Sequence, residues 1–444
     1  MTETLQHSPF QVLKIRDFRH FFIARTSMTL GVNILGTAVG WQVYEITKDA
    51  FSLGMIGLAE FLPFLVVTLL GGYIADIFDR RKIILTCVTL YSLCAFALYL
   101  LSTKFSHIID SQGVVSIFIL VGLIGLVRGF FGPAQASFSS QLIPKELFTN
   151  AATWSSMGWQ LSAVGGPAIG GLLCAFSKGA WSCYLLAAIL AVVGLVLFFT
   201  IESRHETLEK DKKTANNDVN TEGGTNELKM KNEELKSGHL NNFLDSVKIG
   251  LNFVFKNEII LGALALDMFA VLFGGAVALL PAFAKDVLSV GPEGFGALRA
   301  APAVGAVIMA SYLAYNPPVK NAGKLLLIAV AGFGICTILF AVSTNFYFSL
   351  FMLAGTGFFD TVSMVIRGTI VQLFTPNEMR GRVSAVNSLF IGSSNELGAF
   401  ESGAAARLMG LVPSVIFGGT MTLVTVAFAW LRAPKLRGLD LRTK

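Results

Sequence analysis

Residues 71–84, GGYIADIFDRRKII, place two aspartates and a run of charged side chains, Asp79 to Lys82, between two apolar segments. In a soluble protein such a cluster lies on a surface loop. Here the segments on both sides are apolar without an amphipathic stripe, and each reaches about 20 residues, the length that crosses a lipid bilayer as a helix. The stretch therefore predicts a short polar connection between two membrane-spanning helices.

The composition of the whole chain agrees with this interpretation. Of 444 residues, 54% are hydrophobic and 14% are charged, whereas soluble proteins carry about 25% charged residues. Short segments of alternating polarity, which a membrane β-barrel requires, are not visible. An all-α polytopic membrane protein is predicted. Twelve apolar segments are predicted to span the membrane, at residues 21–45, 52–77, 82–101, 114–139, 149–176, 180–201, 257–284, 293–315, 323–343, 345–373, 383–410 and 412–432.

Basic residues in the short connections lie mostly on the side that carries both chain ends. The opposite side has only Lys48, Lys104, Lys178 and Lys285. By the positive-inside rule we expect both termini in the cytoplasm of a bacterium, with the chain in the inner membrane. The same asymmetry accounts for the formal net charge of +6, so nucleic-acid binding is not expected.

The chain divides into two halves joined by a polar stretch. The mixed charge of residues 202–242 and their lack of an apolar face predict a flexible tether, with a regulatory partner site as the lesser alternative. Apolar residues at helical spacing over 240–254 predict a helix that lies at the membrane surface. The predicted units are a cytoplasmic segment 1–20, a six-helix half 21–201, a cytoplasmic linker 202–256, a second six-helix half 257–432 and a cytoplasmic tail 433–444.

The two halves look like copies of one another. A Gln-Leu pair, a proline and a glutamate follow the fourth span and recur after the tenth with one residue inserted. Internal repeats, with a binding site near the membrane midplane where the repeats meet, are typical of secondary transporters. The halves are therefore predicted to be pseudo-symmetric. The matching residues are Gln141, Pro144 and Glu146 in the first half and Gln372, Pro376 and Glu378 in the second.

Gly72, Asp76, Arg80 and Arg81 of the opening stretch match the signature G-x-x-x-D-R-x-G-R-R/K between helices two and three of the major facilitator superfamily, which the chain resembles. The resemblance implies the twelve-helix major facilitator fold. It also implies a latch in which the aspartate, a helix N-terminus and an arginine hold the cytoplasmic side closed. The chain has Ile77 where the family usually has arginine, which predicts a weaker latch.

Span five contains Gly166, Pro167, Gly170 and Gly171, and these residues are similar to the G-P-x-x-G-G antiporter signature of exporters in the superfamily. Clustered glycines permit close helix packing, and proline permits a kink. Ordinary small-residue packing is the alternative explanation. The position in the fifth span favours the exporter.

Span four contains Arg128 and Gly132, which are similar to the family's R-x-x-x-G pattern. An arginine at this depth costs at least about 2.5 kcal/mol on insertion scales, so it must face an aqueous cavity or a carboxylate. The resemblance implies that it is a partner for proton coupling or for an anionic substrate.

Residues 358–372 and 375–410 resemble the third drug:proton antiporter subfamily, which includes enterobactin-type siderophore exporters and macrolide efflux proteins. Arg380 and Arg382 lie in this region, and we group them with the gating residues. The subfamily implies a monomer in the lipid bilayer that is driven by the proton gradient and has no cofactor.

Ionisable residues at depth in the membrane are the best candidates for function. Asp267 is the first choice for proton coupling, because no basic residue neighbours it within its own span; Glu60 and Asp360 follow, with Arg128 as their partner. A structural network of ion pairs explains some of these residues equally well. The residues expected to line a central cavity with Arg128 are Asn33, Trp41, Gln160, Phe269 and Glu396.

Motifs for catalysis do not appear: the sequence has no nucleophile elbow, no phosphate-binding P-loop and no metal-ligand spacing. We therefore expect no enzyme, no metal site and no ATP-driven pump. The expected function is export of a small organic substrate against proton influx by alternating access. A lipid or lysophospholipid flippase, an importer of the same fold and a non-transporting receptor or scaffold are the alternatives.

Overall fold

A computed structural model describes residues 10–77, 79–105, 113–144, 147–201, 248–316, 318, 320–376 and 379–441, with backbone alone for residues 68–77, 149, 380, 381, 385 and 388. The predicted tether at residues 202–242 and the glutamates at 146 and 378 lie outside this description.

Six long helices make up the first half of the chain. Their buried side chains form one continuous core in which Phe21, Tyr91 and Tyr184 are among the largest members. The long apolar stretches form helices because the backbone polar groups of a membrane span must be satisfied within the span itself. The helices are α1 (Arg16–Thr47), α2 (Ala50–Ile77), α3 (Arg80–Thr103), α5 (Val115–Ser139), α6 (Phe148–Ser177) and α7 (Trp181–Phe199).

The second half repeats this plan, with one broken span. The seventh span begins as α10 (Glu258–Phe273), is interrupted at Gly274 and Gly275, and continues through η3 (Ala276–Leu279), α11 (Leu280–Ala282) and the π-helical η4 (Phe283–Val287). At the break, a Cβ on Gly275 would lie 2.7 Å from the carbonyl oxygen of Gly398. Close contact with a neighbouring helix therefore requires glycine here. The remaining helices are α12 (Pro292–Tyr315), α13 (Ala322–Val342), α14 (Phe346–Phe374), α15 (Arg380–Met409) and α16 (Leu411–Arg432).

Eleven helical stretches of the described residues are long and apolar enough to span a membrane. The remaining predicted span, at residues 383–410, corresponds to α15, which has 30 residues but is less apolar than the other long helices because it carries Asn395, Glu396, Glu401 and Arg407. Each predicted span coincides with a helix or, for the seventh, with the broken segment. The predicted fold class is confirmed.

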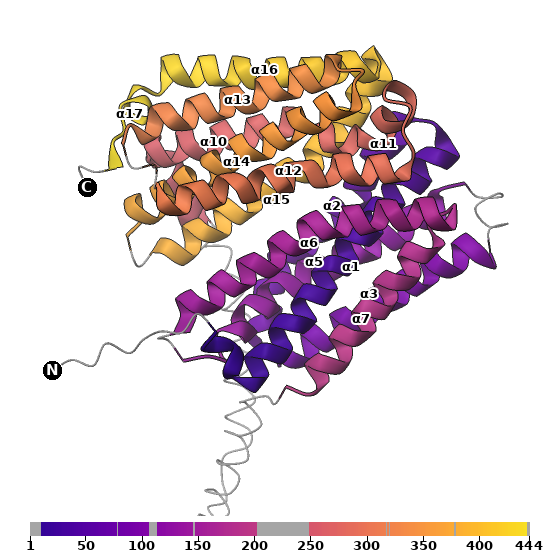
Figure 1. The fold of residues 1–444 in the computed structure, drawn as a ribbon. Coiled ribbons are helices and arrows are strands. Elements are labelled where there is room, and N and C mark those ends of the chain that lie inside the picture. The colour runs from indigo at the N-terminus through magenta and orange to yellow at the C-terminus, as the bar shows by residue number, and fades with distance from the viewer. Residues whose placement is uncertain are drawn as a thin grey trace, which may run out of the picture.

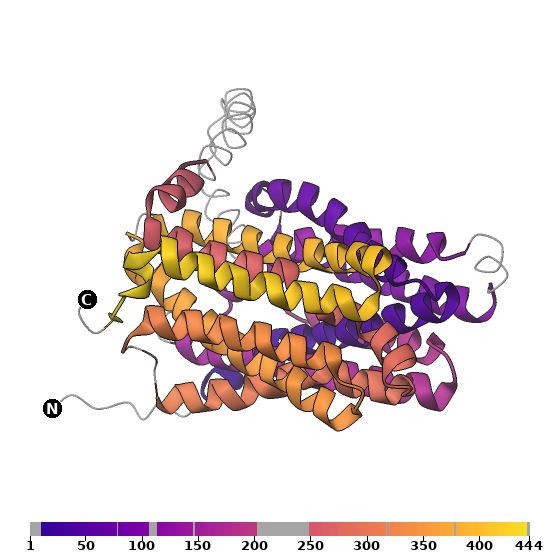
Figure 2. The same ribbon diagram turned by 90° about the horizontal axis from the view of Figure 1, so that it is seen from above.

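The two halves lie against each other as two bundles (Figure 1). The long helices of both bundles run in the same general direction in either view (Figure 1, Figure 2). The start of α1 and the end of α16 lie at one end of the molecule, which we call the termini side. The opposite end, where α1 ends and α2 begins, is called the distal side.

The halves are in closest contact at the distal side. A Cβ on Gly171 of α6 would lie 2.7 Å from the Cα of Gly296 in α12, and a Cβ on Gly54 of α2 would lie 3.0 Å from the Cα of Gly403 in α15. Glycine pairs of this kind allow helix backbones to touch. The arrangement closes the distal side between the two bundles.

Polar and aromatic contacts reinforce the distal closure. Glu45 at the end of α1 pairs with Lys285 of η4 at 2.9 Å, and the neighbouring Tyr44 hydroxyl bonds to the Asp286 carboxylate. The Trp41 ring stacks on the Phe295 ring of α12, with centroids 5.6 Å apart. Each of these contacts joins one half to the other.

The segment after α16 packs onto the second half. α17 (Pro434–Arg437) buries Leu436, and the Gly323 amide donates to the Leu439 carbonyl at 3.2 Å. Lys435 pairs with Glu258 at the start of α10 at 2.7 Å. Residues 433–441, predicted to belong to a cytoplasmic tail, are thus anchored to the ends of α10 and α13.

Helical residues 248–256, at the end of the predicted linker, also contact the second half. A Cβ on Gly250 would lie 3.0 Å from the Arg382 carbonyl oxygen of α15, and Val254 is buried. The helix predicted over 240–254 is therefore observed in part; its first residues lie outside the described part of the chain.

Glycines on α5 provide a test of the packing within the first half. A Cβ on Gly125 would collide with the Glu60 carbonyl of α2, whereas a Cβ on Gly132 would meet nothing within 4 Å. We expect G125A to lower the free energy of unfolding by about 1–3 kcal/mol, the usual range for overpacking. G132A, on the same helix, is the matched control. Thermal unfolding of both variants in detergent checks this, and equal midpoints would contradict the packing described.

Candidate functional site

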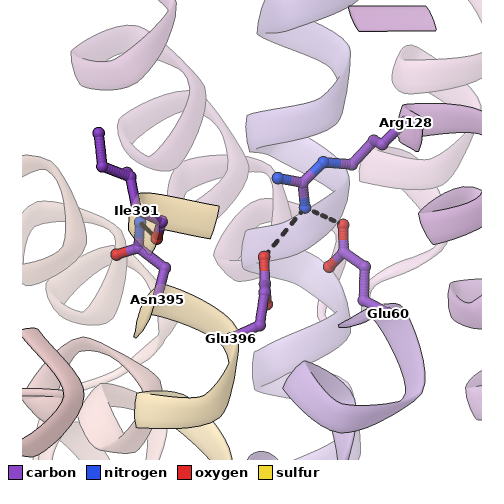
Figure 3. A network of polar contacts seen from close by, with 5 residues as sticks. All are labelled: Glu60, Arg128, Ile391, Asn395 and Glu396. Atoms are coloured by element: carbon purple, nitrogen blue, oxygen red, sulfur yellow. Dashed lines mark hydrogen bonds and ion pairs between the residues drawn. The ribbon is translucent and has the colours of Figure 1, made fainter. Parts of the chain in front are cut away.

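A three-residue bridge joins the two halves (Figure 3), and each of its residues lies near the middle of its own helix. The Arg128 guanidinium of α5 pairs with the Glu60 carboxylate of α2, and the same nitrogen lies 3.2 Å from the Glu396 carboxylate of α15. One cation is thus shared by a carboxylate of its own half and one of the opposite half. Ion pairs of this kind are the expected solution for charge placed inside a membrane.

Glycines bring the three helices of this bridge together. The Gly125 backbone of α5 lies directly against the Glu60 carbonyl of α2. On the other side of α2, a Cβ on Gly57 would lie 3.0 Å from the Glu396 carbonyl. Because α2 approaches both neighbours closely, the short Glu60 side chain lies within reach of Arg128 while Glu396 faces the same nitrogen.

Two cavities meet at the bridge. One, of about 610 Å³, is lined by Arg25, Asn33, Arg128 and further residues of the first half, and its lining also includes Arg299 from α12. The other, of about 450 Å³, extends into the second half and is lined by Asp360 and Asn395 among others. The residues that line both are Gly36, Ile56, Glu60, Arg299 and Glu396.

The bridge side chains are partly exposed because they form the walls of these cavities. The exposed fraction is 44% for the Arg128 side chain and 19% for each glutamate. Water in the cavity therefore reaches all three groups. That access is what proton exchange or substrate contact at this point requires.

Arg299 makes a separate contact between the halves. Its guanidinium donates to the Gly36 carbonyl of α1 at 3.1 Å, and a Cβ on Gly36 would crowd it at 3.3 Å. Sequence reasoning placed this arginine inside a span but did not select it as a functional residue. The sequence of α12 alone does not show this contact, because the glycine of α1 that makes room for the arginine lies in the other half of the chain.

Asp267 has a partner that its own span does not supply. Arg367 of α14 pairs with it inside the second half, and each side chain is only 7% exposed. Asp267 does not line either cavity, whereas Asp360 lines the cavity of about 450 Å³. Of the predicted proton-coupling residues, the structure brings Glu60, Arg128 and Asp360 to the cavities and places Asp267 in the protein interior.

Of the residues predicted to line a central cavity, some line the two cavities and others lie elsewhere. Asn33 and Glu396 line the cavities. Trp41 belongs to the distal closure, Phe269 stacks on Phe273 with centroids 6.4 Å apart, and neither is among the residues that line these cavities. Gln160 is not among them either; its neighbour Trp159 is.

The glycines of the Gly-Pro motif contact two different helices. Gly166 lies against Asn33 of α1, and a Cβ on Gly170 would be 3.2 Å from the Thr37 Cβ of the same helix. Gly171 instead faces Gly296 of α12 in the opposite half. The motif thus allows α6 to pack closely against α1 of its own half and against α12 of the opposite half.

The opening motif is described in part. The structure describes only the backbone of Gly72, Asp76 and Arg380. Asp79 accepts from the Arg81 amide at 2.9 Å and so caps the start of α3, while the Arg81 guanidinium donates to the Phe199 carbonyl at the end of α7 at 2.7 Å. At the start of α15, the Arg382 guanidinium lies 3.7 Å from the Met379 sulfur.

Among the described residues, no group of three or more His, Cys, Asp or Glu side chains is placed to hold a metal ion.

Comparisons with known proteins identify the family. The family model for the Major Facilitator Superfamily matches residues 21–399, and the chain belongs to this superfamily. A protein named enterobactin exporter EntS from Shigella flexneri is 25% identical over 416 residues, which cover 92% of this chain and 89% of the relative. The protein of the same name from Escherichia coli O1:K1 / APEC is 24% identical over the same length. The predicted resemblance is thereby confirmed.

Solved structures agree on the fold. A POT family transporter in complex with 5-aminolevulinic acid has a TM-score of 0.70 at 12% identity, covering 95% of this chain and 96% of that one. A D-xylose-proton symporter has a TM-score of 0.69 at 12% identity, covering 96% and 99%. At this level of identity the likeness concerns the fold alone.

The bridge yields a prediction on stability. R128Q leaves two carboxylates facing one another without their shared cation, so we expect a loss of about 1–2 kcal/mol, below the value for a fully buried pair because cavity water screens the charges. Adding E396Q to R128Q should recover part of this loss. Thermal unfolding in detergent measures both, with R432Q on the exposed surface of α16 as the control. A double variant less stable than R128Q would contradict the bridge.

The buried pair of Asp267 and Arg367 yields a second prediction. Each of D267N and R367Q leaves an unpaired buried charge, which costs about 3–5 kcal/mol. Combined, the two substitutions should cost clearly less than the sum of their separate effects. A double-mutant cycle on unfolding free energies tests this. Strictly additive effects would show that the two side chains do not interact.

Proposed function

We propose that the chain is a proton-coupled exporter of a small organic substrate in the bacterial inner membrane, with both termini in the cytoplasm. The observation that carries the proposal is the bridge of Glu60, Arg128 and Glu396, because it places two water-accessible carboxylates at the point where the two halves and the two cavities meet. The halves correspond to residues 21–201 and 257–432, with 202–256 as their cytoplasmic linker.

The distribution of contacts supports alternating access. The distal side is closed by glycine pairs, by Glu45 with Lys285 and by Trp41 on Phe295. Toward the termini side, a recess that shares Arg25 with the larger cavity extends to Ser140 and Phe148, at the ends of α5 and α6. With the termini in the cytoplasm, this is a conformation that receives substrate from the cytoplasm.

Proton coupling follows from the shared cation. A glutamate that gains a proton can no longer form an ion pair with Arg128. Protonation of Glu396 therefore weakens the link between the halves, whereas protonation of Glu60 removes the partner of Arg128 within the first half. The halves then rock, and the distal side opens. Asp360, on the wall of the second cavity, is the next candidate, and Asp267 follows because Arg367 already pairs with it.

The substrate class is proposed from the volume of the larger cavity and from the names of the related proteins. A cavity of about 610 Å³ holds a drug-sized molecule. The relatives named enterobactin exporter suggest a siderophore-like or amphipathic organic compound. The expected partners are this substrate and the lipid bilayer, with the proton gradient as the energy source and a monomer as the working unit.

Proton movement in proteoliposomes tests the proposal. We expect candidate substrates to drive a pH change inside vesicles that contain the wild-type protein, and we expect E60Q and E396Q to reduce its rate at least about tenfold. D267N should keep coupling in whatever fraction of protein folds. E293Q, at an exposed carboxylate in the first turn of α12, is the control and should behave as wild type.

Other outcomes would decide among the alternatives. Substrate movement without proton movement would contradict the proposal and indicate a uniporter or a flippase. Loss of coupling in D267N with wild-type coupling in E60Q and E396Q would place the proton site at Asp267.

A further inference from the structure

The larger cavity carries more positive than negative charge. Its described lining includes three arginines from three helices, Arg25 of α1, Arg128 of α5 and Arg299 of α12, against the two carboxylates Glu60 and Glu396. Both carboxylates are engaged by Arg128. The only described polar contact of the Arg299 guanidinium is the Gly36 carbonyl.

Of the three arginines that line the larger cavity, Arg25 lies nearest the termini side, because it also lines the recess at the ends of α5 and α6. Among the described residues, its guanidinium has no ion-pair partner and no hydrogen-bond acceptor; the Thr29 hydroxyl donates to its backbone carbonyl, not to the side chain. A cation inside a membrane protein is costly to keep without a counter-charge. A bound anion supplies such a counter-charge.

A recess of about 520 Å³ opens beside Arg25 and continues the larger cavity, with which it shares Arg25, Gln135 and Trp159. Serine hydroxyls line it, including Ser139 of α5 and Ser155 of α6, and none of its described lining residues is acidic. Trp159 is 53% exposed and lines both the recess and the larger cavity, so it is accessible to a bound molecule. The recess thus combines one unpaired guanidinium, small hydroxyl and amide groups, and an accessible aromatic ring.

We propose that this recess is the loading site for the substrate and that it selects an anionic aromatic compound. The acidic group of the substrate pairs with Arg25, whose planar fork matches a carboxylate in two parallel hydrogen bonds. The aromatic ring packs against Trp159, while Gln135 and Ser155 bond to the remaining polar atoms. The inference rests on the proposed function, because it names the substrate of the same transport path.

The charge layout argues against a cationic substrate at this point. The carboxylates that would attract a cation, Glu60, Glu396 and Asp360, line the cavities deeper in the molecule, and two of them already share Arg128. For an anion, Arg299 is the next guanidinium along the cavity, and among the described residues it has no ion-pair partner. An anionic lipid headgroup also carries an acidic group but has no aromatic ring. Binding of a non-aromatic acid therefore distinguishes a lipid headgroup from an aromatic substrate.

Equilibrium binding to the purified full-length protein in detergent tests the inference by calorimetry. The probes are naphthalene-2-carboxylate, its neutral carboxamide and the non-aromatic cyclohexanecarboxylate. We expect the naphthalene carboxylate to bind at least about tenfold more tightly than the carboxamide, the usual effect of a charge-assisted hydrogen bond. Cyclohexanecarboxylate should bind several-fold more weakly than the naphthalene acid.

Substitutions locate the site. R25Q should weaken binding of the naphthalene carboxylate at least about tenfold, R25K should weaken it less because the charge remains, and W159L should weaken it about threefold or more. R432Q, an exposed arginine at the same end of the molecule, should bind as wild type. Thermal unfolding establishes that each variant is folded. If R25Q is not folded, binding of the carboxylate to R25K and binding of the carboxamide to the wild-type protein test the role of the Arg25 charge.

The inference is overturned if the carboxamide binds as tightly as the carboxylate, if folded R25Q binds as wild type, or if the non-aromatic acid binds as tightly as the aromatic one. These results are independent of proton coupling. A neutral or cationic compound that drives proton movement while the naphthalene acid fails to bind would leave the proposed exporter standing and refute only its substrate class.

Discussion

The rest of the structure depends on one guanidinium shared between two halves of the chain. Arg128 cannot remain unpaired at its depth, and its two partners lie on α2 and α15, one in each bundle. The pairing requires α2 to approach α5 and α15 so closely that Gly125 and Gly57 have no room for side chains. Small residues in the sequence and charges in the membrane are thus parts of one arrangement: the glycines set the helix distances at which the charges neutralise each other.

The same constraint explains why the molecule has a closed and an open side. Backbone contact through Gly54 and Gly171, with the pair of Glu45 and Lys285, holds the halves together at the distal side. The bridge lies farther along, where the cavities begin. A change in its charge acts at the boundary between the closed and the open part of the interface. Protonation of Glu396 removes an attraction between the halves without disturbing the core of either bundle.

Much of the fold follows from the sequence, because each span is an apolar run of membrane length bounded by polar residues. The run at 383–410 predicts α15 even though it contains polar residues. The charged pairs were harder, since Asp267 meets Arg367 from a helix 100 positions away. Gln160 was predicted at the cavity, yet Trp159 lies there, because one residue along a helix turns the side chain by about 100°. Asn33, Arg128 and Glu396 are predicted to line a cavity and Glu60 to couple protons, because they are polar or charged side chains at depth in a span; all four line the cavities of the structure. Arg25 and Arg299 are not selected from the sequence, because most of the residues that surround them in the cavity come from other helices.

Distances between spin labels test the central claim most directly, namely that the bridge controls which side is open. One label pair, S140C with Y315C, spans the halves at the termini side; another, F176C with Y347C, spans them at the distal side. The five native cysteines are buried, and they compete little for the label. In E60Q/E396Q, where Arg128 has lost both partners, the account predicts shorter distances at the termini side and longer ones at the distal side than in the unsubstituted bridge. Identical distance distributions with and without the two carboxylates would contradict it.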